Sequence, residues 1–425
     1  MSAASVSLES LQFLFQNMDA NKRFEIYIRC PSLRDVEISV PLKIYDLMLA
    51  KNCVDVNGTR YNLGIVRKCN VGKPPVYVAV QNKDGGVQHE VDRYGILDLS
   101  DAITVSAGDV EIRRGMPIQR DDDVMMGRLE NRVQVYEAQL AEEQERMPIR
   151  NRRAIIRLEN TVDDARARLF AYQCRRDNIP PNYLHFLQVT TYRVVNEQEQ
   201  KTIQRFIHNK KYSEAMKQLT TMLFGGRSCP ILVTRIFFNC RIGVIRLPVN
   251  VKFHIEQLMF NGAVGTTLEA LSPIIHELSY PLKKLGFHAH SVADVQHPVV
   301  ETSEEVEIKV FFDRVIEIMS TVTNRRVVFN TELPEETLEE LIRRWNRLQR
   351  PMGAQCVIDF REEHEFLSEM EDILKGLNGV ANDDENVIIP VSNETQLNVS
   401  YGPFPEFAPC SKWAVKLLNE SVDHS

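Results

Sequence analysis

The stretch LEALSPIIHELSYPLKKLGF, residues 268–287, decides how the second half of the chain is interpreted. It is typical of a helix that ends near Pro281 and is followed by a strand. A helix and a strand in succession form the unit from which layered α/β folds and solenoids are built. The stretch therefore predicts an α/β fold in which such units recur.

Similar units surround this stretch on both sides. Residues 334–349, PEETLEELIRRWNRLQ, are typical of a helix with Pro334 near its first turn and acidic residues at its start. A second helix is expected at 362–379, and a last short helix or strand around Trp413. Strands are expected at 229–239, 248–262, 306–312, 324–332, 355–361 and 395–402. The spacing of about 25–40 residues per unit is in the range of solenoid repeats, of which a curved sheet as in leucine-rich solenoids is one arrangement.

Residues 119–180 have a different period. Two apolar stripes run at steps of three and four residues: Leu129, Val133, Tyr136 and Leu140 in the first, and Ile155, Leu158, Val162, Ala165, Leu169 and Tyr172 in the second. Pro148 lies between them and should break the path. Each stripe is shorter than three or four heptads, so we expect an antiparallel helical hairpin rather than a long coiled coil. The acidic triplet 121–123 fits the start of its first helix.

The region before the hairpin is expected to be rich in strands. Asn57-Gly58 between apolar runs indicates a β-hairpin, and Pro- and Gly-rich stretches such as VGKPPVY indicate loops and edge strands. We therefore expect a mixed α/β fold with four regions. These are a short N-terminal helical unit (1–40), a strand-rich region (41–118), the inserted helical hairpin (119–180) and repeating strand–helix units (181–425).

The N-terminal unit raises a question of its own. Residues 8–20 are typical of a short amphipathic helix, whereas Phe24, Ile26 and Ile28 alternate as in a half-buried strand. Cys30 follows, and it could belong to a metal or redox site, a core or a docking module. A nucleophilic thiol needs a neighbour that lowers its pKa, and the adjacent Arg29 would point away on a strand. A small buried thiol is the better interpretation.

Composition excludes several classes of function. The formal net charge of −7 disfavours a general role on nucleic acid or a membrane surface. No apolar run approaches the roughly 20 residues needed to cross a bilayer, and the first residues do not resemble a signal peptide. The eight cysteines contain no CxxC pair. Free thiols in a reducing compartment, and hence an intracellular protein of cytoplasm or nucleus, are expected.

Catalytic and metal-binding patterns are missing from the sequence. There is no GxGxxG after a strand, no GxxxxGK[ST], no HExxH and no GxSxG. His288, His290 and His297 lie close in sequence, but no Cys or acidic residue completes a ligand set at a short fixed spacing. We therefore expect no catalytic residues, no metal, no cofactor and no enzymatic activity.

The stretch LESLQFLFQNMDANKRFEIYIRCPSLRDVEISVPLKI, residues 8–44, resembles the start of the nematode F-box C proteins, a lineage-expanded family with a domain of unknown function. The shared pattern is a Leu-rich helix, an Asn-x-Arg step, Arg-Cys-Pro and an apolar run. Here its members are Leu11, Leu14, Asn21, Arg23, Arg29, Cys30 and Pro31. Further stretches, such as NGTRYNLGIVRKCNVGKPP and LIRRWNRLQRPMGAQCVIDF, extend the resemblance over nearly the whole chain.

The resemblance implies an adaptor of a cullin-type ubiquitin ligase, in which an F-box docks on a Skp1-type linker and the remainder holds a substrate protein. Apolar anchors from a small helical module suit such docking. The candidates are Leu8, Leu11, Leu14, Phe15, Phe24 and Ile26. The sequence departs from the usual F-box pattern because SVSLES lacks a Leu-Pro step and a late tryptophan position is missing. The alternatives are therefore a degenerate F-box in a non-ligase binding or scaffold protein, and apolar residues that simply pack as core.

Overall fold

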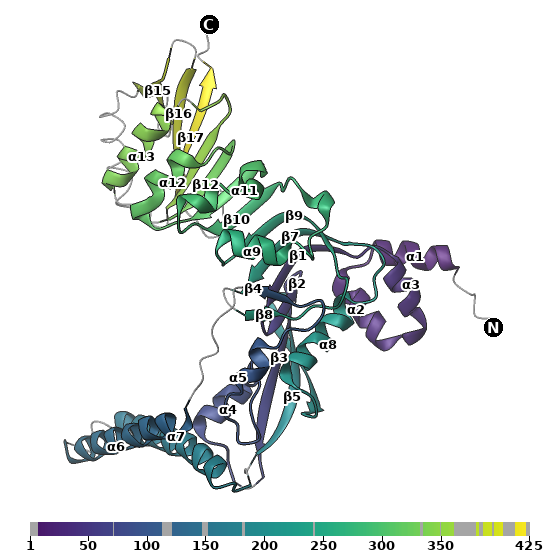
Figure 1. Ribbon diagram of the computed structural model, residues 1–425, viewed down its shortest axis with the longest axis vertical. Helices are drawn as coiled ribbons and strands as arrows, with labels where there is room; N and C mark the ends of the chain where they lie inside the picture. The colour runs from purple at the N-terminus through teal and green to yellow at the C-terminus, as the bar shows by residue number, and fades with distance from the viewer. Residues whose placement is uncertain are drawn as a thin grey trace. The chain divides into compact units, whose positions relative to one another are not determined.

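The computed structural model describes residues 7–70, 72–112, 121–146, 152–180, 183–240, 243–331, 335–348, 350–360, 380–381, 386–392, 395–402 and 413–421. The chain divides into two compact units (Figure 1). Unit 1 comprises Met1–Val40, Leu49–Ser228 and Ile242–Val251, and unit 2 comprises Pro41–Met48, Cys229–Arg241 and Lys252–Ser425. Helices and strands mix in both units, so the predicted mixed α/β class is confirmed.

Unit 2 contains a series of parallel strands joined by helices. Each strand pairs in parallel with the next one along the chain, in the order β7 (Ile231–Asn239), β9 (Phe253–Phe260), β10 (Lys284–His288), β11 (Glu305–Lys309), β12 (Arg326–Asn330) and β13 (Gln355–Phe360). The connecting helices are α9 (Val264–Leu271), α10 (Val292–Val295), α11 (Pro298–Thr302), α12 (Val315–Thr321) and α13 (Glu335–Arg347), with short 3-10 turns at Glu277–Ser279 and Phe312–Arg314. Parallel pairing of successive strands is the order of a solenoid, so the repeating strand–helix units are present.

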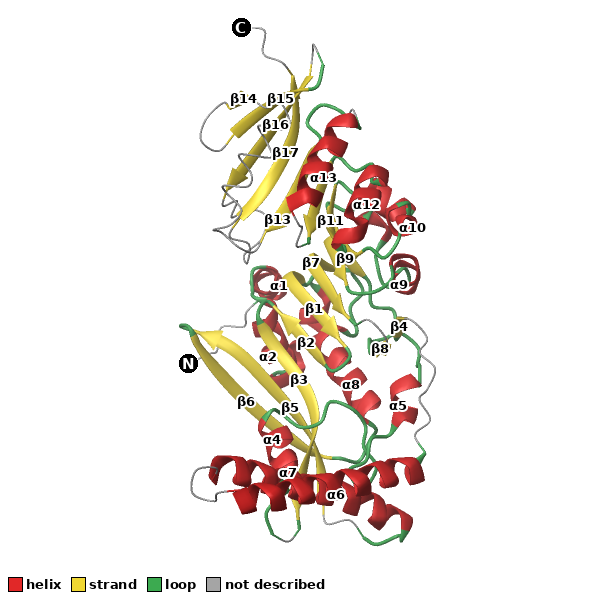
Figure 2. Cartoon of the chain, turned by 90° about the vertical axis from the view of Figure 1, so that its left-hand side faces the viewer, coloured by secondary structure: helices red, strands yellow, loops and turns green. Residues whose placement is uncertain are grey.

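Register explains how this repeat forms its core. Leu285 of β10 is level with Val306 of β11, which is level with Val327 of β12, and all three are buried. Alternate residues of a strand point to opposite faces, so these side chains share one face of the sheet. The helices α9, α10, α12 and α13 lie on one side of the strands (Figure 2), and Trp345 of α13 is fully buried.

The C-terminal part of unit 2 changes to antiparallel pairing. β17 (Trp413–Ser421) pairs with β13, and β16 (Thr395–Gly402), β15 (Asn386–Pro390) and β14 (Val380–Ala381) follow outward. The segment around Trp413 is therefore a strand. The helix expected at 362–379 lies outside the described residues.

Unit 1 is built on antiparallel strands. β2 (Cys53–Val56), β3 (Thr59–Cys69), β5 (Tyr183–Val195) and β6 (Gln198–Ile207) pair in chain order, while β1 (Lys43–Ala50) belongs mostly to unit 2. Asn57 and Gly58 both have positive φ, as a tight turn between β2 and β3 requires, so the predicted hairpin is present. Unit 1 also contains the short pair β4 (Val110–Ile112) and β8 (Gly243–Ile245), and the helices α4 (Val76–Lys83), α5 (Leu99–Ile103) and α8 (Tyr212–Phe224).

The predicted helical hairpin consists of α6 (Asp122–Arg146) and α7 (Arg152–Arg176) in unit 1. Ion pairs join Glu137 to Arg166 (2.7 Å) and Asp122 to Arg175, so the two helices run antiparallel. Asp121 accepts a hydrogen bond from the amide of Asp123 at 2.9 Å, which is the capping role expected for the acidic triplet. The position of Pro148 lies outside the described residues.

Three predictions of local secondary structure were wrong. The helix that was expected to end near Pro281 ends at Leu271 (α9), and only the 3-10 turn Glu277–Ser279 lies between it and β10. The alternating segment after residue 20 is not a strand but the helix α2 (Ala20–Arg29), because Asp19 caps it and the buried residues Ala20 and Phe24 are four positions apart. The segment that begins at Val76 was expected to be loop or edge strand and is the helix α4. Pro75 immediately precedes α4, at a place where a missing amide proton costs nothing.

Candidate functional site

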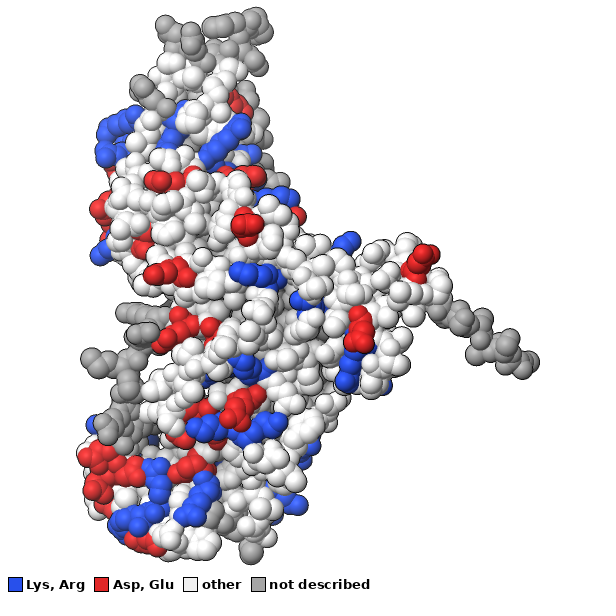
Figure 3. Space-filling view, turned by 45° about the vertical axis from the view of Figure 1, so that its right-hand side comes forward, with Lys and Arg blue, Asp and Glu red and all other residues white. Residues whose placement is uncertain are grey.

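The first helix of unit 1 presents apolar side chains to solvent. α1 (Leu8–Gln16) has Ser7 as its N-cap and buries only one of its residues, Phe15. Leu8, Phe13 and Leu14 are 57%, 66% and 53% exposed. Figure 1 shows α1 as the outermost of the N-terminal helices, and Figure 3 shows that the surface over these helices is mostly uncharged. Exposed large apolar side chains gathered on one short helix are typical of an interaction surface.

The residues predicted for docking therefore fall into two groups. Leu8 and Leu14 are exposed, and Leu11 and Ile26 are partly exposed. Phe15 and Phe24 are core side chains, and the ring of Phe24 packs edge-on against Phe224 of α8 at 6.1 Å between centroids. The more exposed candidates therefore come from α1, while the two phenylalanines pack in the core of unit 1.

A buried charged cluster holds the helices that carry this surface. Arg23 of α2 is 1% exposed, and its Nε donates to Glu37 of α3 (Arg34–Ser39) at 2.8 Å. The Nη2 of Arg23 donates to the carbonyl oxygens of Glu37 and Val40, each at 2.8 Å. Glu37 also accepts two bonds of 2.9 Å from Arg227, which follows α8. This cluster therefore joins α2, α3 and the end of α8.

The charges in this cluster are unequal, since one carboxylate faces two guanidiniums. Burial lowers the pKa of Arg23 from its ordinary value, Glu37 acts to raise it, and Arg227 acts to lower it. Nη1 and Nε of Arg227 are buried and make no hydrogen bond. Removing Glu37 would leave two buried cations without a counter-ion, which is among the most costly changes a fold can suffer. The sequence gives no sign of this cluster because Arg227 lies 190 residues from Glu37.

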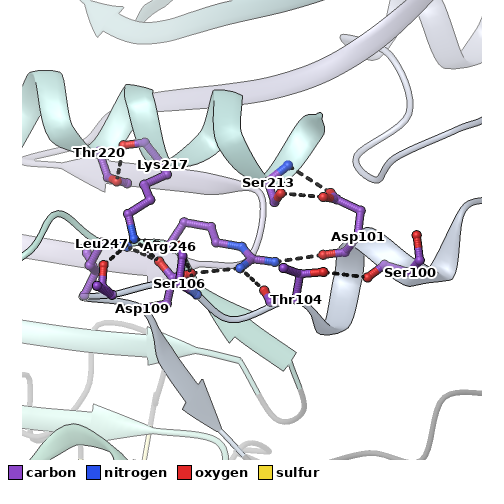
Figure 4. Close-up of polar contacts among 11 residues, drawn as sticks. Ser100, Asp101, Thr104, Ser106, Asp109, Ser213, Lys217, Thr220, Arg246 and Leu247 are labelled. Atoms are coloured by element: carbon purple, nitrogen blue, oxygen red, sulfur yellow. Dashed lines mark hydrogen bonds and ion pairs between the residues drawn. The ribbon is translucent and has the colours of Figure 1, made fainter. Parts of the chain in front are cut away.

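A second buried cluster holds the loop around Asp109 (Figure 4). Lys217 of α8 donates to Oδ1 of Asp109 at 2.8 Å, and Arg246, which follows β8, donates to Oδ2 at 2.9 Å. The amide and hydroxyl of Ser106 donate to the same Oδ2 at 2.9 and 2.8 Å. Nearby, Asp101 accepts bonds from the amide and hydroxyl of Ser213 at the start of α8.

The Asp109 cluster is a structural feature rather than a reactive one. Burial alone would raise the pKa of Asp109, but the hydrogen bonds from Lys217, Ser106 and Arg246 outweigh it and hold that pKa below its ordinary value. The carboxylate is fully buried, and both of its oxygens accept hydrogen bonds. An ionised, occupied and enclosed carboxylate is a poor proton acceptor and cannot reach a substrate. This cluster connects α5, α8 and β8 into one body.

Unit 2 offers a different surface on the face of its sheet opposite α9, α10, α12 and α13 (Figure 2). Lys284, Glu305 and Arg326 lie there in register on three adjacent strands, and Glu307 lies two residues further along β11 on the same face. Lys284 pairs with Glu305 at 2.9 Å and Glu307 at 2.8 Å, and Arg326 pairs with Glu305 at 2.9 Å. Burial would lower the pKa of Lys284, but the two carboxylates outweigh it and raise that pKa. These side chains are all partly exposed, so they are accessible to a partner.

The histidines and cysteines singled out by the sequence do not gather into a site. His288 and His290 have ring centroids 6.3 Å apart, and Nδ1 of His297 accepts from the amide of Val299 as the cap of α11. Cys30 is partly exposed, so the prediction of a buried thiol was wrong. Within the described ranges there is no group of three or more metal-ligating side chains. Nor does any described helix combine the length and the apolarity that crossing a membrane requires.

A family model matches part of the chain. Residues 211–362 match the sequence model of a domain of unknown function, DUF3557. This segment begins at α8 and runs through the parallel strands to β13, so the predicted presence of a domain of unknown function is confirmed. No curated protein matches the chain.

Proposed function

We propose that this protein is an interaction adaptor, which binds a Skp1-type linker through α1 and presents a substrate protein to a cullin-type ubiquitin ligase. The single observation that carries the proposal is the exposed apolar surface of α1, formed by Leu8, Leu14 and Phe13. The resemblance to the nematode F-box C proteins over nearly the whole chain gives this surface its expected partner. An intracellular location, in cytoplasm or nucleus, is part of the same proposal.

The mode of contact follows from the geometry of α1. A short helix with leucine and phenylalanine side chains can fill a hydrophobic groove on a partner helix pair. Such anchors contribute most when the element that carries them is rigid before binding. The buried ion pairs of Arg23 with Glu37 support this rigidity, because they fix α2 and α3, and α3 contacts α1.

The substrate surface is proposed to lie in unit 2. The repeating strands present the charged row of Lys284, Glu305 and Arg326 on the face opposite the described helices. Solenoid-type repeats commonly bind partners on such an extended face. Charges on a binding face select partners of complementary charge and speed their encounter, while adding less to affinity than apolar anchors do.

The test is binding of the full-length chain to a purified Skp1-type linker, with an established F-box protein as positive control. A double variant, Leu8→Ser with Leu14→Ser, should weaken capture at least tenfold, since each truncated anchor typically costs about 1 kcal/mol or more. The matched control is Leu278→Ser, which changes a 70% exposed leucine in unit 2 and should leave capture unchanged.

Two outcomes would overturn the proposal. Failure of the wild-type chain to bind any Skp1-type linker, while the positive control binds, removes the ligase role. Equal capture by the wild type and the Leu8 and Leu14 double variant places the contact elsewhere. The first outcome favours a non-ligase binding or scaffold protein, for which the hairpin offers exposed apolar residues such as Phe170 and Ile156.

A further inference from the structure

Unit 1 contains a cavity of about 350 Å³ between the hairpin and the strand β3. Its base is formed by Arg67 of β3 together with apolar side chains, which include Ile96 and Leu129. Its rim contains two more arginines, Arg132 of α6 and Arg168 of α7. None of the residues that line it is acidic, so the cavity combines three positive charges with an apolar floor.

Arg67 is the unusual member of this set. The side chain is only 4% exposed, and its Nε makes no hydrogen bond. Its Nη2 donates to the neutral side chain of Gln81, and its guanidinium lies 5.2 Å from the ring centre of Tyr77. In the described part of the chain, no carboxylate forms an ion pair with Arg67, Arg132 or Arg168. Buried charges in proteins are normally paired, so a guanidinium of this kind calls for an anion.

The aromatic wall adds a second recognition element. The guanidinium of Arg168 lies 4.2 Å from the centre of the Tyr77 ring, so Tyr77 is contacted by two arginines. Such cation–π contacts align the planar guanidiniums while leaving N–H donors available at their edges. Arginine edges bind carboxylate and phosphate oxygens in bidentate fashion.

We propose that this cavity binds a small organic anion, with a phosphate or carboxylate group on Arg67 and an apolar or aromatic body on Ile96 and Leu129. The volume lies at the lower end of the range for small-molecule sites, which favours a ligand of modest size over a protein segment. The site belongs wholly to unit 1 and does not depend on the proposed adaptor role.

The test is titration calorimetry of the full chain with defined probes. Phenyl phosphate and benzoate represent the two anionic groups, inorganic phosphate lacks the apolar body, and benzyl alcohol lacks the charge. We expect saturable binding of phenyl phosphate or benzoate, at least tenfold weaker binding of inorganic phosphate, and none of benzyl alcohol. Failure of both aromatic anions to bind the folded wild type overturns the proposal, as does equal binding of inorganic phosphate and phenyl phosphate.

Two variants test whether the anionic probe binds in this cavity. Arg67→Met should abolish binding of the anionic probe, and Arg168→Gln should weaken it at least threefold. Arg168 lies on the exposed rim, so this second variant keeps the test valid if Arg67→Met does not fold. The matched control is Arg193→Gln on β5, which changes an exposed arginine that does not line the cavity and should bind the probe as the wild type does. Wild-type affinity in both Arg67→Met and Arg168→Gln would exclude this cavity as the site.

Discussion

The N-terminal helices of unit 1 and the parallel repeat of unit 2 distribute charge in opposite ways. The N-terminal helices bury Arg23 and Glu37 and expose Leu8 and Leu14. The repeat buries rows of apolar residues, such as that of Val306, and keeps its ion pairs on a partly exposed face. Hydrophobic burial is the ordinary source of stability, so the repeat follows the common pattern. The N-terminal helices bury Phe15 and Phe24 as well, but they depart from this pattern at the buried pair Arg23 and Glu37.

This difference indicates what each region is for. A buried ion cluster stabilises little compared with apolar residues of the same volume. Here it joins α2, α3 and the end of α8 through Arg23, Glu37 and Arg227. Apolar side chains left outside gain nothing for the fold and become useful when a partner covers them. We interpret the N-terminal helices as a surface whose geometry is fixed for binding, and the repeat as a scaffold stabilised mainly by its own packing.

The largest effect is expected from the buried cluster. Glu37→Gln removes the charge that compensates Arg23 and Arg227, and it should lower the free energy of unfolding by about 3–5 kcal/mol. The measurement is urea denaturation followed by far-ultraviolet circular dichroism, because both tryptophans, Trp345 and Trp413, lie in unit 2 and do not report on unit 1.

The control for this variant is a surface ion pair on α2, the helix that carries Arg23. Glu25 pairs with Lys22 at 3.0 Å with both side chains well exposed, so Glu25→Gln should change stability by less than about 0.5 kcal/mol. If Glu37→Gln and Glu25→Gln had similar small effects, the buried cluster would not be what holds these helices.

In the repeat of unit 2, removing a buried apolar side chain should cost more stability than removing a charge. Ile308→Ala in β11 removes a fully buried side chain and should destabilise by about 2–5 kcal/mol. Glu307→Gln, one residue earlier on the open face, weakens the ion pair with Lys284 and should cost less than about 1 kcal/mol. Tryptophan emission during denaturation checks both, since Trp345 is buried in this unit. A larger loss from Glu307→Gln than from Ile308→Ala would contradict the comparison.

The stability of unit 1 should depend on pH through His185. Burial, with a smaller contribution from the neighbouring His208, lowers the pKa of His185 from 6.5 to about 4. Between these values the unfolded chain binds a proton that the folded chain does not, so stability should fall as the pH drops from 6.5 toward 4. Allowing for partial solvent access, we expect a loss of about 1–2 kcal/mol.

Thermal denaturation at several pH values, for wild type and His185→Gln, measures this contribution. Glutamine does not titrate, so the variant should lose less stability than the wild type across the same window. Identical pH profiles of the two proteins would show that His185 is not the group responsible.

The sequence predicted regular elements better than it predicted contacts. The hairpin 119–180 and the strands of the repeat follow from apolar spacing, which is a local signal. The helix α2 was missed because Phe24, Ile26 and Ile28 alternate by coincidence, whereas the cap Asp19 and the buried Arg23 decide the local structure. The docking candidates of α1 were recognised from resemblance, but which of them are exposed depends on tertiary packing.

The variant expected to weaken binding of the Skp1-type linker should have the smallest effect on stability. The double variant Leu8→Ser and Leu14→Ser changes side chains that are more than half exposed, so the free energy of unfolding should change by less than about 0.5 kcal/mol. Phe15→Ala on the same helix removes a buried ring and should cost about 3–5 kcal/mol. Denaturation of both variants, followed by circular dichroism, therefore distinguishes side chains available to a partner from side chains that stabilise the fold. A loss above about 1 kcal/mol in the double variant would mean that Leu8 and Leu14 support the fold of α1 itself.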